Sequence, residues 1–196
     1  MQRFSQAADN NKSAILSALT PLLGQACSLL EVGSGSGQHV IHMARVLTHL
    51  HWQPTERAIE LPELSSNIST YGGVNILPPI VLDLAERDWP SKTFDCVYSA
   101  NVMHIVSKDL GENLVRGAAS VLSGHGLLIL YGPYKYAGEF TTLSNASFDR
   151  TLRTRDKHSG VRDFEWVQDV ASSCGLTLAE DMPMPANNLM VSFTCA

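Results

Sequence analysis

The sequence predicts an α/β fold in which strands and helices alternate within one domain. Three observations indicate this fold: short apolar runs typical of buried strands recur between amphipathic helical patterns, one run enters a loop of alternating glycines, and two neighbouring strand-like segments finish the chain. The 196 residues are 44% hydrophobic and 17% charged. Since we see no break in composition, we expect a single domain over residues 1–196 with a sizeable core.

The glycine-rich stretch is the first candidate site. A buried apolar run leads into Gly33, Gly35 and Gly37, and a helical pattern begins near Gln38. Glycines let a backbone approach a ligand without a Cβ in the way, and a helix start presents unpaired N–H groups. A dinucleotide loop needs glycine or alanine where Gln38 stands. The alternate glycines, with Glu31 two residues before the first, resemble instead the Glu/Asp-x-Gly-x-Gly-x-Gly pattern of class I S-adenosylmethionine-dependent methyltransferases.

That resemblance implies a cofactor, and the acid suits it. S-adenosylmethionine carries an amino acid and a sulfonium where a dinucleotide carries pyrophosphate, so a carboxylate near the loop complements its cationic groups. The expected cofactor-binding residues in this stretch are Glu31, Gly33, Ser34, Gly35, Gly37, Gln38 and His39. The alternative is an ordinary strand-to-helix loop without a ligand.

The other elements follow in alternating order. We expect strands at residues 29–32, 51–56, 78–84, 94–99 and 126–131, and a closing pair at 176–180 and 189–195. We expect helices from a cap at Asn10 or Asn11 to Gly24, over 38–50, over 62–71, from Ser107 to Gly124, and from Phe164 to Gly175. Methyltransferase folds often use a helix before the first strand to close over the cofactor.

Two acids are expected at strand ends. Glu56 lies 19 residues after Gly37, where nucleotide-binding folds place an acceptor for ribose hydroxyls. The alternative for Glu56 is a solvated side chain beside Arg57. In the methyltransferase pattern, Asp83 can accept from the adenine amino group, and we include the adjacent Leu84 among the cofactor-binding residues.

Polar residues after the fourth strand are expected beside the transferable methyl group. Ligands in open α/β sheets bind at the carboxyl ends of strands, and Asn101 and His104 follow such an end. Asn101 is assigned to both cofactor and acceptor sides. His104 is either a general base or a structural histidine. Tyr134 either walls a substrate pocket or belongs to a packed loop edge.

Residues 141–163 are expected to be less regular and to hold specificity. Their arginines and aspartates either bind an anionic or zwitterionic substrate or form a network that holds an insertion in place, and we favour the network. His39 and His42 are three residues apart, but further metal ligands are not evident, so we expect no metal.

The chain resembles a small uncharacterised methyltransferase-like family, domain of unknown function 938, over nearly its whole length. The segments that carry the resemblance are GSGQH (35–39), WQP (52–54), NVMHI (101–105), LYGP (130–133), SNASFD (144–149), GVRD (160–163) and MPANNL (184–189). It implies a Rossmann-like class I methyltransferase fold: a seven-stranded, mostly parallel sheet of order 3-2-1-4-5-7-6, an antiparallel last strand and helices on both faces.

The hypothesis of methyl transfer also needs an acceptor side, and the chain departs from the family pattern at two places. We expect the acceptor to be lined by Asn101, His104, Tyr134, Asp149, Asn187 and Asn188. The chain has Asn10 and Ala14 where the family is expected to have Arg and Pro. After WQP the family has Ser-Asp and a further acid, whereas here Glu56 is the one acid retained.

The expected function is methyl transfer from S-adenosylmethionine to a small polar molecule, with S-adenosylhomocysteine as product. The alternatives are a non-catalytic protein that binds this cofactor and serves as an interaction platform, and a nicotinamide-dependent oxidoreductase, which Gln38 disfavours.

A net charge of −5 without a basic stripe argues against nucleic acid as a partner. Without a membrane-length apolar run or signal peptide, and with four cysteines in no metal or redox spacing, we expect a cytoplasmic protein with mostly buried thiols. The sequence does not determine the oligomeric state.

Overall fold

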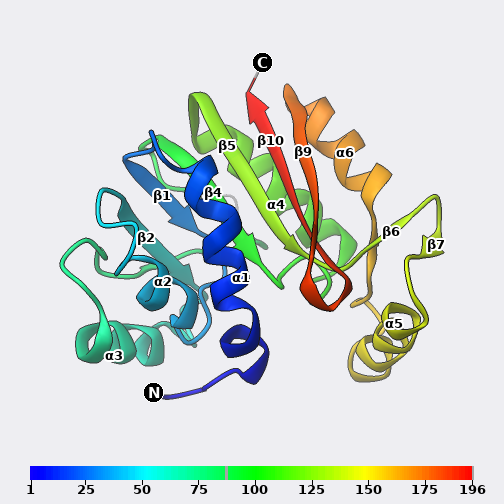
Figure 1. Cartoon of the computed structure of the whole chain (residues 1–196), viewed down its shortest axis with the longest axis horizontal. Coiled ribbons are helices and arrows are strands. Elements are labelled where there is room, and N and C mark those ends of the chain that lie inside the picture. Colours follow the sequence, from blue (N-terminus) through cyan, green and yellow to red (C-terminus); the bar gives the residue numbers. More distant parts are fainter. Residues whose placement is uncertain (87, 196) are drawn as a thin grey trace.

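A central sheet of seven strands organises the computed structural model, which describes residues 1–86 and 88–195 (Figure 1). Its order is β3-β2-β1-β4-β5-β10-β9. The strands are β1 (Ser28–Glu31), β2 (His51–Glu56), β3 (Ile80–Val81), β4 (Phe94–Ala100), β5 (Leu122–Gly132), β9 (Leu176–Met184) and β10 (Asn188–Cys195). Strands β1 to β5 pair in parallel, whereas β10 runs antiparallel to both β5 and β9. The predicted fold class and strand order are confirmed.

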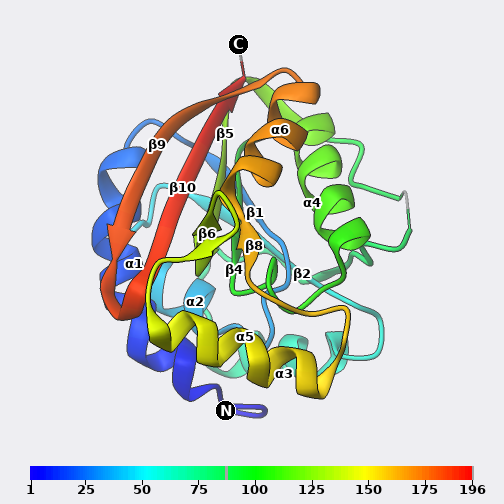
Figure 2. The same cartoon turned by 90° about the vertical axis from the view of Figure 1, so that its right-hand side faces the viewer.

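Helices cover both faces of this sheet (Figure 2). They are α1 (Gln6–Leu22), α2 (Gln38–Met43), α3 (Leu61–Tyr71), α4 (Lys108–Val121) and α6 (Phe164–Ser173), whereas α5 (Leu143–Arg155) lies beyond the lower edge of the sheet in Figure 1. Successive strand residues alternate between the faces: Leu29 packs with the α1 and α2 core, and Leu30 with the α4 and α6 core. Strands buried on both faces need apolar residues at every position, which explains their continuous apolar runs.

The first helix begins earlier than predicted. Ser5 is its cap, and the Ser5 hydroxyl accepts a hydrogen bond from the Ala8 N–H at 3.3 Å. The prediction of a cap at Asn10 or Asn11 is therefore wrong. The apolar stripe starts only at Ile15, so the two polar turns before it carried no periodic signal.

The segment after β5 is more regular than predicted. It forms helix α5 and a second sheet of order β7-β6-β8, made of β6 (Tyr134–Tyr136), β7 (Glu139–Phe140) and β8 (Arg162–Asp163). Thr142 caps α5 by accepting from the Asn145 N–H at 3.2 Å. The expectation of irregular structure is therefore wrong. The sequence carries little helical signal here, because Leu152 is the one apolar side chain that α5 buries.

Smaller differences concern lengths and exposure. Strand β3 has two residues instead of seven, and β5 begins at Leu122. Cys96 is buried but Cys27 is exposed and the other two cysteines are partly exposed, so the expectation of mostly buried thiols is wrong. Within residues 1–86 and 88–195, every helix is too short or too polar to cross a bilayer.

Candidate active site

The glycine loop leaves β1 at the carboxyl-terminal edge of the sheet, the lower edge in Figure 1. Gly33 and Gly35 have φ of +72° and +58°, in the left-handed region that favours glycine. A Cβ on Gly33 would lie 2.6 Å from Val102 Cγ2, whereas a Cβ on Gly35 would meet no described atom within 4 Å. The loop is therefore closely packed at Gly33 and open at Gly35.

Strand β2 holds this loop through hydrogen bonds. The Ser34 N–H donates to the Thr55 carbonyl at 2.9 Å, and the Thr55 hydroxyl donates to the Glu31 carbonyl at 2.8 Å. The Gly35 N–H donates to Glu56 Oε2 at 2.8 Å, and Glu56 Oε1 accepts from the Arg57 N–H at 3.0 Å. Glu56 thus lies against the open part of the loop, on the strand end where the sequence predicted an acid.

Glu31 is buried beneath the loop. Its side chain is 2% exposed, and its Oε2 has no hydrogen-bond partner among the described residues. Burial raises the pKa of Glu31 to about 7; the Ser34 hydroxyl opposes the rise and the charge of Glu56 adds to it. A buried carboxyl oxygen without a partner is costly, so this position favours an incoming cation or hydrogen-bond donor.

Gln38 and His39 contact helix α1. Gln38 Oε1 accepts from the Ser5 N–H at 2.6 Å and from the Ser36 hydroxyl at 2.9 Å, and Gln38 Nε2 donates to the Ser5 carbonyl at 3.1 Å. His39 Nε2 lies 2.8 Å from Asn11 Oδ1. Burial lowers the pKa of His39 to about 4, so its ring is neutral at pH 7. These two side chains hold the start of α1 against the loop.

Asn67 has a similar role that the sequence did not reveal. It is 2% exposed, and its Nδ2 donates to the carbonyls of Gln2 (2.9 Å) and Ser36 (3.0 Å). Its Oδ1 accepts from the Gln2 N–H at 2.8 Å. An asparagine within a predicted helix was the one available signal, since it is a poor helix former.

Asp83 follows β3 at the same sheet edge. Its Oδ1 accepts from the Ala85 N–H at 2.9 Å, and the preceding Leu82 N–H donates to the Glu56 carbonyl at 3.0 Å. The Leu84 side chain is buried in the α4 and α6 core, and its carbonyl accepts from Asn113 at 2.9 Å. Asp83 is therefore near the end of β2, while Leu84 faces the core.

Asn101 and His104 follow β4. Asn101 has φ of +60°, which is uncommon for a residue other than glycine, and its N–H donates to the Tyr131 carbonyl at 2.8 Å. His104 is 5% exposed, its Nδ1 has no partner among the described residues, and its ring meets Phe148 edge-on at 5.3 Å. Burial, then the charge of Arg162, lowers the pKa of His104 to about 4, so the imidazole is neutral at pH 7.

Asp149 is occupied by internal contacts. Its Oδ2 accepts from Arg153 Nε at 2.8 Å, and its Oδ1 accepts from the Val161 N–H at 2.8 Å. This is the arrangement of an Arg–Asp network that holds an insertion. A Cβ on Gly160 would lie 2.8 Å from Asp149 Oδ1, so the chain fits closely around this carboxylate.

Tyr134 lies in the core and Asn187 at a surface turn. Tyr134 is 1% exposed among the side chains of the α4 and α6 core, its hydroxyl has no partner within the described part of the chain, and burial raises its pKa. Asn187 Nδ2 donates to the Ser144 hydroxyl at 3.0 Å, and Asn188 Nδ2 to the Pro185 carbonyl at 3.1 Å. The turn between β9 and β10 thus rests on α5.

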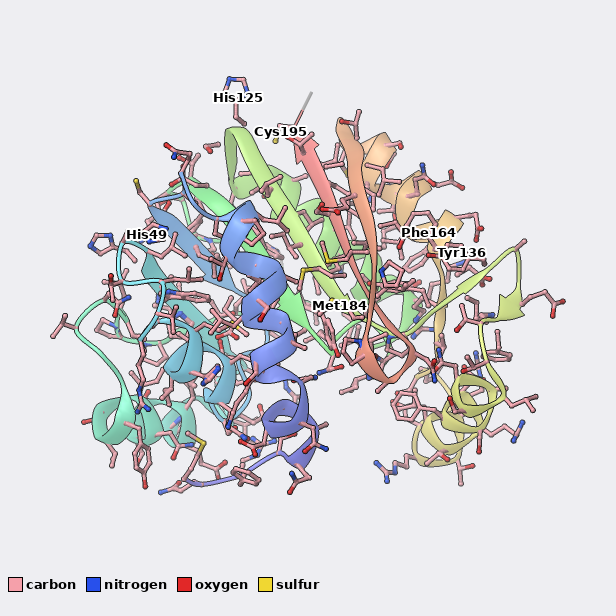
Figure 3. All side chains as sticks on the ribbon, in the orientation of Figure 1. His49, His125, Tyr136, Phe164, Met184 and Cys195 are labelled. Atoms are coloured by element: carbon pink, nitrogen blue, oxygen red, sulfur yellow. The ribbon has the colours of Figure 1, made fainter. Side chains whose placement is uncertain are left out.

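The small sheet is fastened to the main sheet by aromatic side chains. Tyr136 of β6 meets Phe164 of α6 with ring centroids 5.2 Å apart (Figure 3). The Tyr136 hydroxyl also donates to Asp181 of β9. Among the described residues no group of three His, Cys, Asp or Glu side chains is arranged to hold a metal.

The strand order and the glycine loop define a class I methyltransferase fold. Solved structures support this class: an O-methyltransferase family protein from Burkholderia thailandensis (TM-score 0.79, 14% identity, 97% of this chain and 60% of that chain), the S-adenosylmethionine-dependent methyltransferase SibL in its apo form (0.81, 18%, 96% and 55%) and the mitomycin 7-O-methyltransferase MmcR (0.84, 14%, 97% and 54%). The chain spans 54–60% of the length of these three proteins.

Residues 2–195 match the family described as "Protein of unknown function (DUF938)", and the chain belongs to that family. The resemblance stated from the sequence is confirmed. Identities of 12–18% to the methyltransferase structures support the fold alone.

Proposed function

We propose that the protein transfers a methyl group from S-adenosylmethionine to a small polar molecule and releases S-adenosylhomocysteine. The observation that carries the proposal is the unpartnered Oε2 of buried Glu31 beside a loop that is open at Gly35. A backbone without a Cβ and an unsatisfied carboxyl suit a ligand that brings a cation close to the main chain.

The residues present fit that cofactor. Glu31 would complement its cationic groups, the Gly33–Gly37 loop would accommodate its amino-acid part, and Glu56 and Asp83 would accept from ribose and adenine. Glu56 lies 2.8 Å from the Gly35 N–H, on the loop's open side. When bound, S-adenosylmethionine supplies an electrophilic methyl group on a positively charged sulfur.

His104 is the candidate group for proton transfer on the acceptor side. Its imidazole is neutral at pH 7, and its unpartnered Nδ1 is a free hydrogen-bonding site. A pKa near 4 makes it a weak base. A weak base suffices where the acceptor is a hydroxyl oxygen that has already gained a methyl group, because the proton left on that oxonium is strongly acidic. Asn101, at the end of β4, would orient the acceptor.

The test is a calorimetric titration with S-adenosylmethionine and S-adenosylhomocysteine. The wild type is expected to bind both. Gly35→Asp should lose binding, since a side chain would enter the open space of the loop and add a negative charge beside Glu31 and Glu56. Gly138→Asp is the matched control, because Gly138 also has a left-handed φ, +81°, and open space, but lies in the turn between β6 and β7.

Two outcomes would contradict the cofactor assignment. Either the wild type binds neither compound, or the Gly35 and Gly138 variants lose affinity equally. With binding established, a screen of small polar molecules for S-adenosylhomocysteine release would identify the acceptor.

The second candidate function is cofactor binding without turnover. One observation favours it: both carboxylate oxygens of Asp149, a predicted acceptor-side residue, are engaged by Arg153 and Val161. This candidate predicts tight binding of both compounds, no turnover across broad substrate pools and a stable protein partner.

A further inference from the structure

A pocket lined by no predicted cofactor residue lies between α4, α6 and the small sheet. Its volume is about 170 Å³, and Val161 and the Trp166 ring contribute to its walls. Four cationic side chains and one acid, Asp163, complete the lining; the cations are Lys108, Lys135, Arg153 and Arg162. A chain of net charge −5 thus concentrates positive charge in one small pocket.

Two of these cations have no acidic partner. Arg153 is paired with Asp149 at 2.8 Å and Lys135 with Asp163 at 3.2 Å. Within residues 1–86 and 88–195, no carboxylate lies within 4.0 Å of the charged nitrogens of Lys108 or Arg162. The pocket therefore retains about two positive charges that the protein itself does not neutralise.

Arg162 is built into the pocket rather than free on the surface. It is 8% exposed; its Nε donates to the Met103 carbonyl at 3.2 Å, and its Nη2 donates to the carbonyls of His158 at 2.7 Å and of Val106. Its Nη1 has no hydrogen-bond partner in the described part of the chain. Burial and then repulsion by Arg153 lower the pKa of Arg162, and the charge of Asp149 opposes this fall without cancelling it.

Lys108 and Trp166 form the opposite side. Lys108 is the first residue of α4, after the Ser107 cap, so the partial positive charge of the helix start adds to its own. Its Nζ lies 5.0 Å from the centroid of the Trp166 ring. The site combines a fixed guanidinium, an adaptable ammonium and an aromatic wall, features that suit an oxyanion attached to a small organic group.

We propose that this pocket binds a small molecule through a group that carries two negative charges, such as a phosphate monoester or a dicarboxylate. The charge of the group matches the two unpaired cations. Arg162 also fixes the carbonyls of Met103 and Val106, on either side of His104, so the ligand lies behind the segment that carries His104.

The test uses inorganic phosphate and malonate as probes, each titrated calorimetrically at constant ionic strength. Saturable binding to the wild type is expected. Tighter binding of phosphate would indicate a phosphate monoester as the ligand, and tighter binding of malonate a dicarboxylate. Lys108→Gln should weaken binding roughly tenfold, because it removes a charge-assisted contact from an exposed residue that the fold does not need.

Lys92→Gln is the matched control, since Lys92 Nζ also lies over an aromatic ring, 4.8 Å from the Phe94 centroid, outside the pocket. The Lys92→Gln variant should bind both probes as tightly as the wild type does. Binding of neither probe, or an equal loss in both variants, would overturn the proposal. Because the probes need no S-adenosylmethionine, the result is independent of the proposed methyl transfer.

Discussion

The two sides of the candidate active site are held in place differently. On the side of α1 and α3, main-chain geometry shapes the glycine loop through left-handed glycines and the bond from the Ser34 N–H to the Thr55 carbonyl, to which the Thr55 and Glu56 side chains add one bond each. On the side of α5, which lies beside the turn between β9 and β10 (Figure 1), side-chain hydrogen bonds hold the structure. Asp149 joins Arg153 to Val161, and Asn187 joins the final turn to α5. Under the proposed function, cofactor binding would depend mainly on backbone shape, and acceptor binding on contacts between side chains.

Gly33→Ala should have the largest effect on the loop side. Its Cβ would lie 2.6 Å from Val102 Cγ2 on a backbone with φ of +72°, and overpacking with backbone strain together cost about 3 kcal/mol. We expect loss of S-adenosylhomocysteine binding in calorimetry and a lower free energy of unfolding in urea.

The control is Gly175→Ala, because Gly175 has φ of +78° but no described atom within 4 Å of a Cβ. It should cost about 1 kcal/mol, from strain alone. Equal losses in the two variants would show that close packing at Gly33 does not shape the loop.

Glu31→Gln should have opposite effects on binding and stability. Burial raises the pKa of Glu31 to about 7 from its ordinary value of 4.5, so ionisation of Glu31 makes the fold less stable as pH rises from about 4.5 to 7. Removing the charge should stabilise the ligand-free protein at pH 8 by about 1 to 3 kcal/mol. Thermal unfolding at pH 5 and pH 8 measures this difference.

The same carboxylate predicts a pH dependence of binding. A cationic ligand favours ionised Glu31, so wild-type affinity should rise between pH 6 and 8 with release of a proton. In Glu31→Gln, affinity should be about tenfold lower at pH 8 and nearly independent of pH. A wild type without pH dependence would exclude Glu31 as the partner of the cation.

The sequence predicted the loop side better than the acceptor side, for physical reasons. Buried parallel strands require continuous apolar runs, and left-handed turns require glycine, so both leave local signals. Helix α5 leaves little signal because it buries Asn145, Asp149 and Leu152, two of which are polar. Contacts such as that between Gln38 and Ser5 join residues 33 positions apart, and spacing along the chain does not reveal them.

Asp149→Ala tests the acceptor side. It removes two hydrogen bonds from a carboxylate that is 6% exposed, which should destabilise residues 143–163 by about 1 to 3 kcal/mol. Amide hydrogen exchange should accelerate there, and turnover should fall while cofactor affinity stays unchanged. Asp156→Ala is the control within the same insertion, since exposed Asp156 accepts one bond, from the His158 N–H at 2.8 Å. Reduced cofactor affinity in Asp149→Ala would mean that the two sides are coupled.

Gln38→Ala should have the smallest effect and gives the sharpest test of the comparison. Like Asn67, Gln38 is a point on the loop side where a side chain joins three groups; those of Gln38 are the Ser5 N–H, the Ser5 carbonyl and the Ser36 hydroxyl. Losing these bonds should cost about 1 kcal/mol, accelerate amide exchange at the start of α1 and weaken S-adenosylhomocysteine binding a few-fold.

Gln6→Ala is the control, since the exposed Gln6 side chain forms a hydrogen bond with Asn10 alone, within α1. If main-chain geometry holds the loop, exchange within residues 33–37 should stay as slow as in the wild type. Rapid exchange throughout the loop would instead show that side chains hold both sides, and the contrast between them would fail.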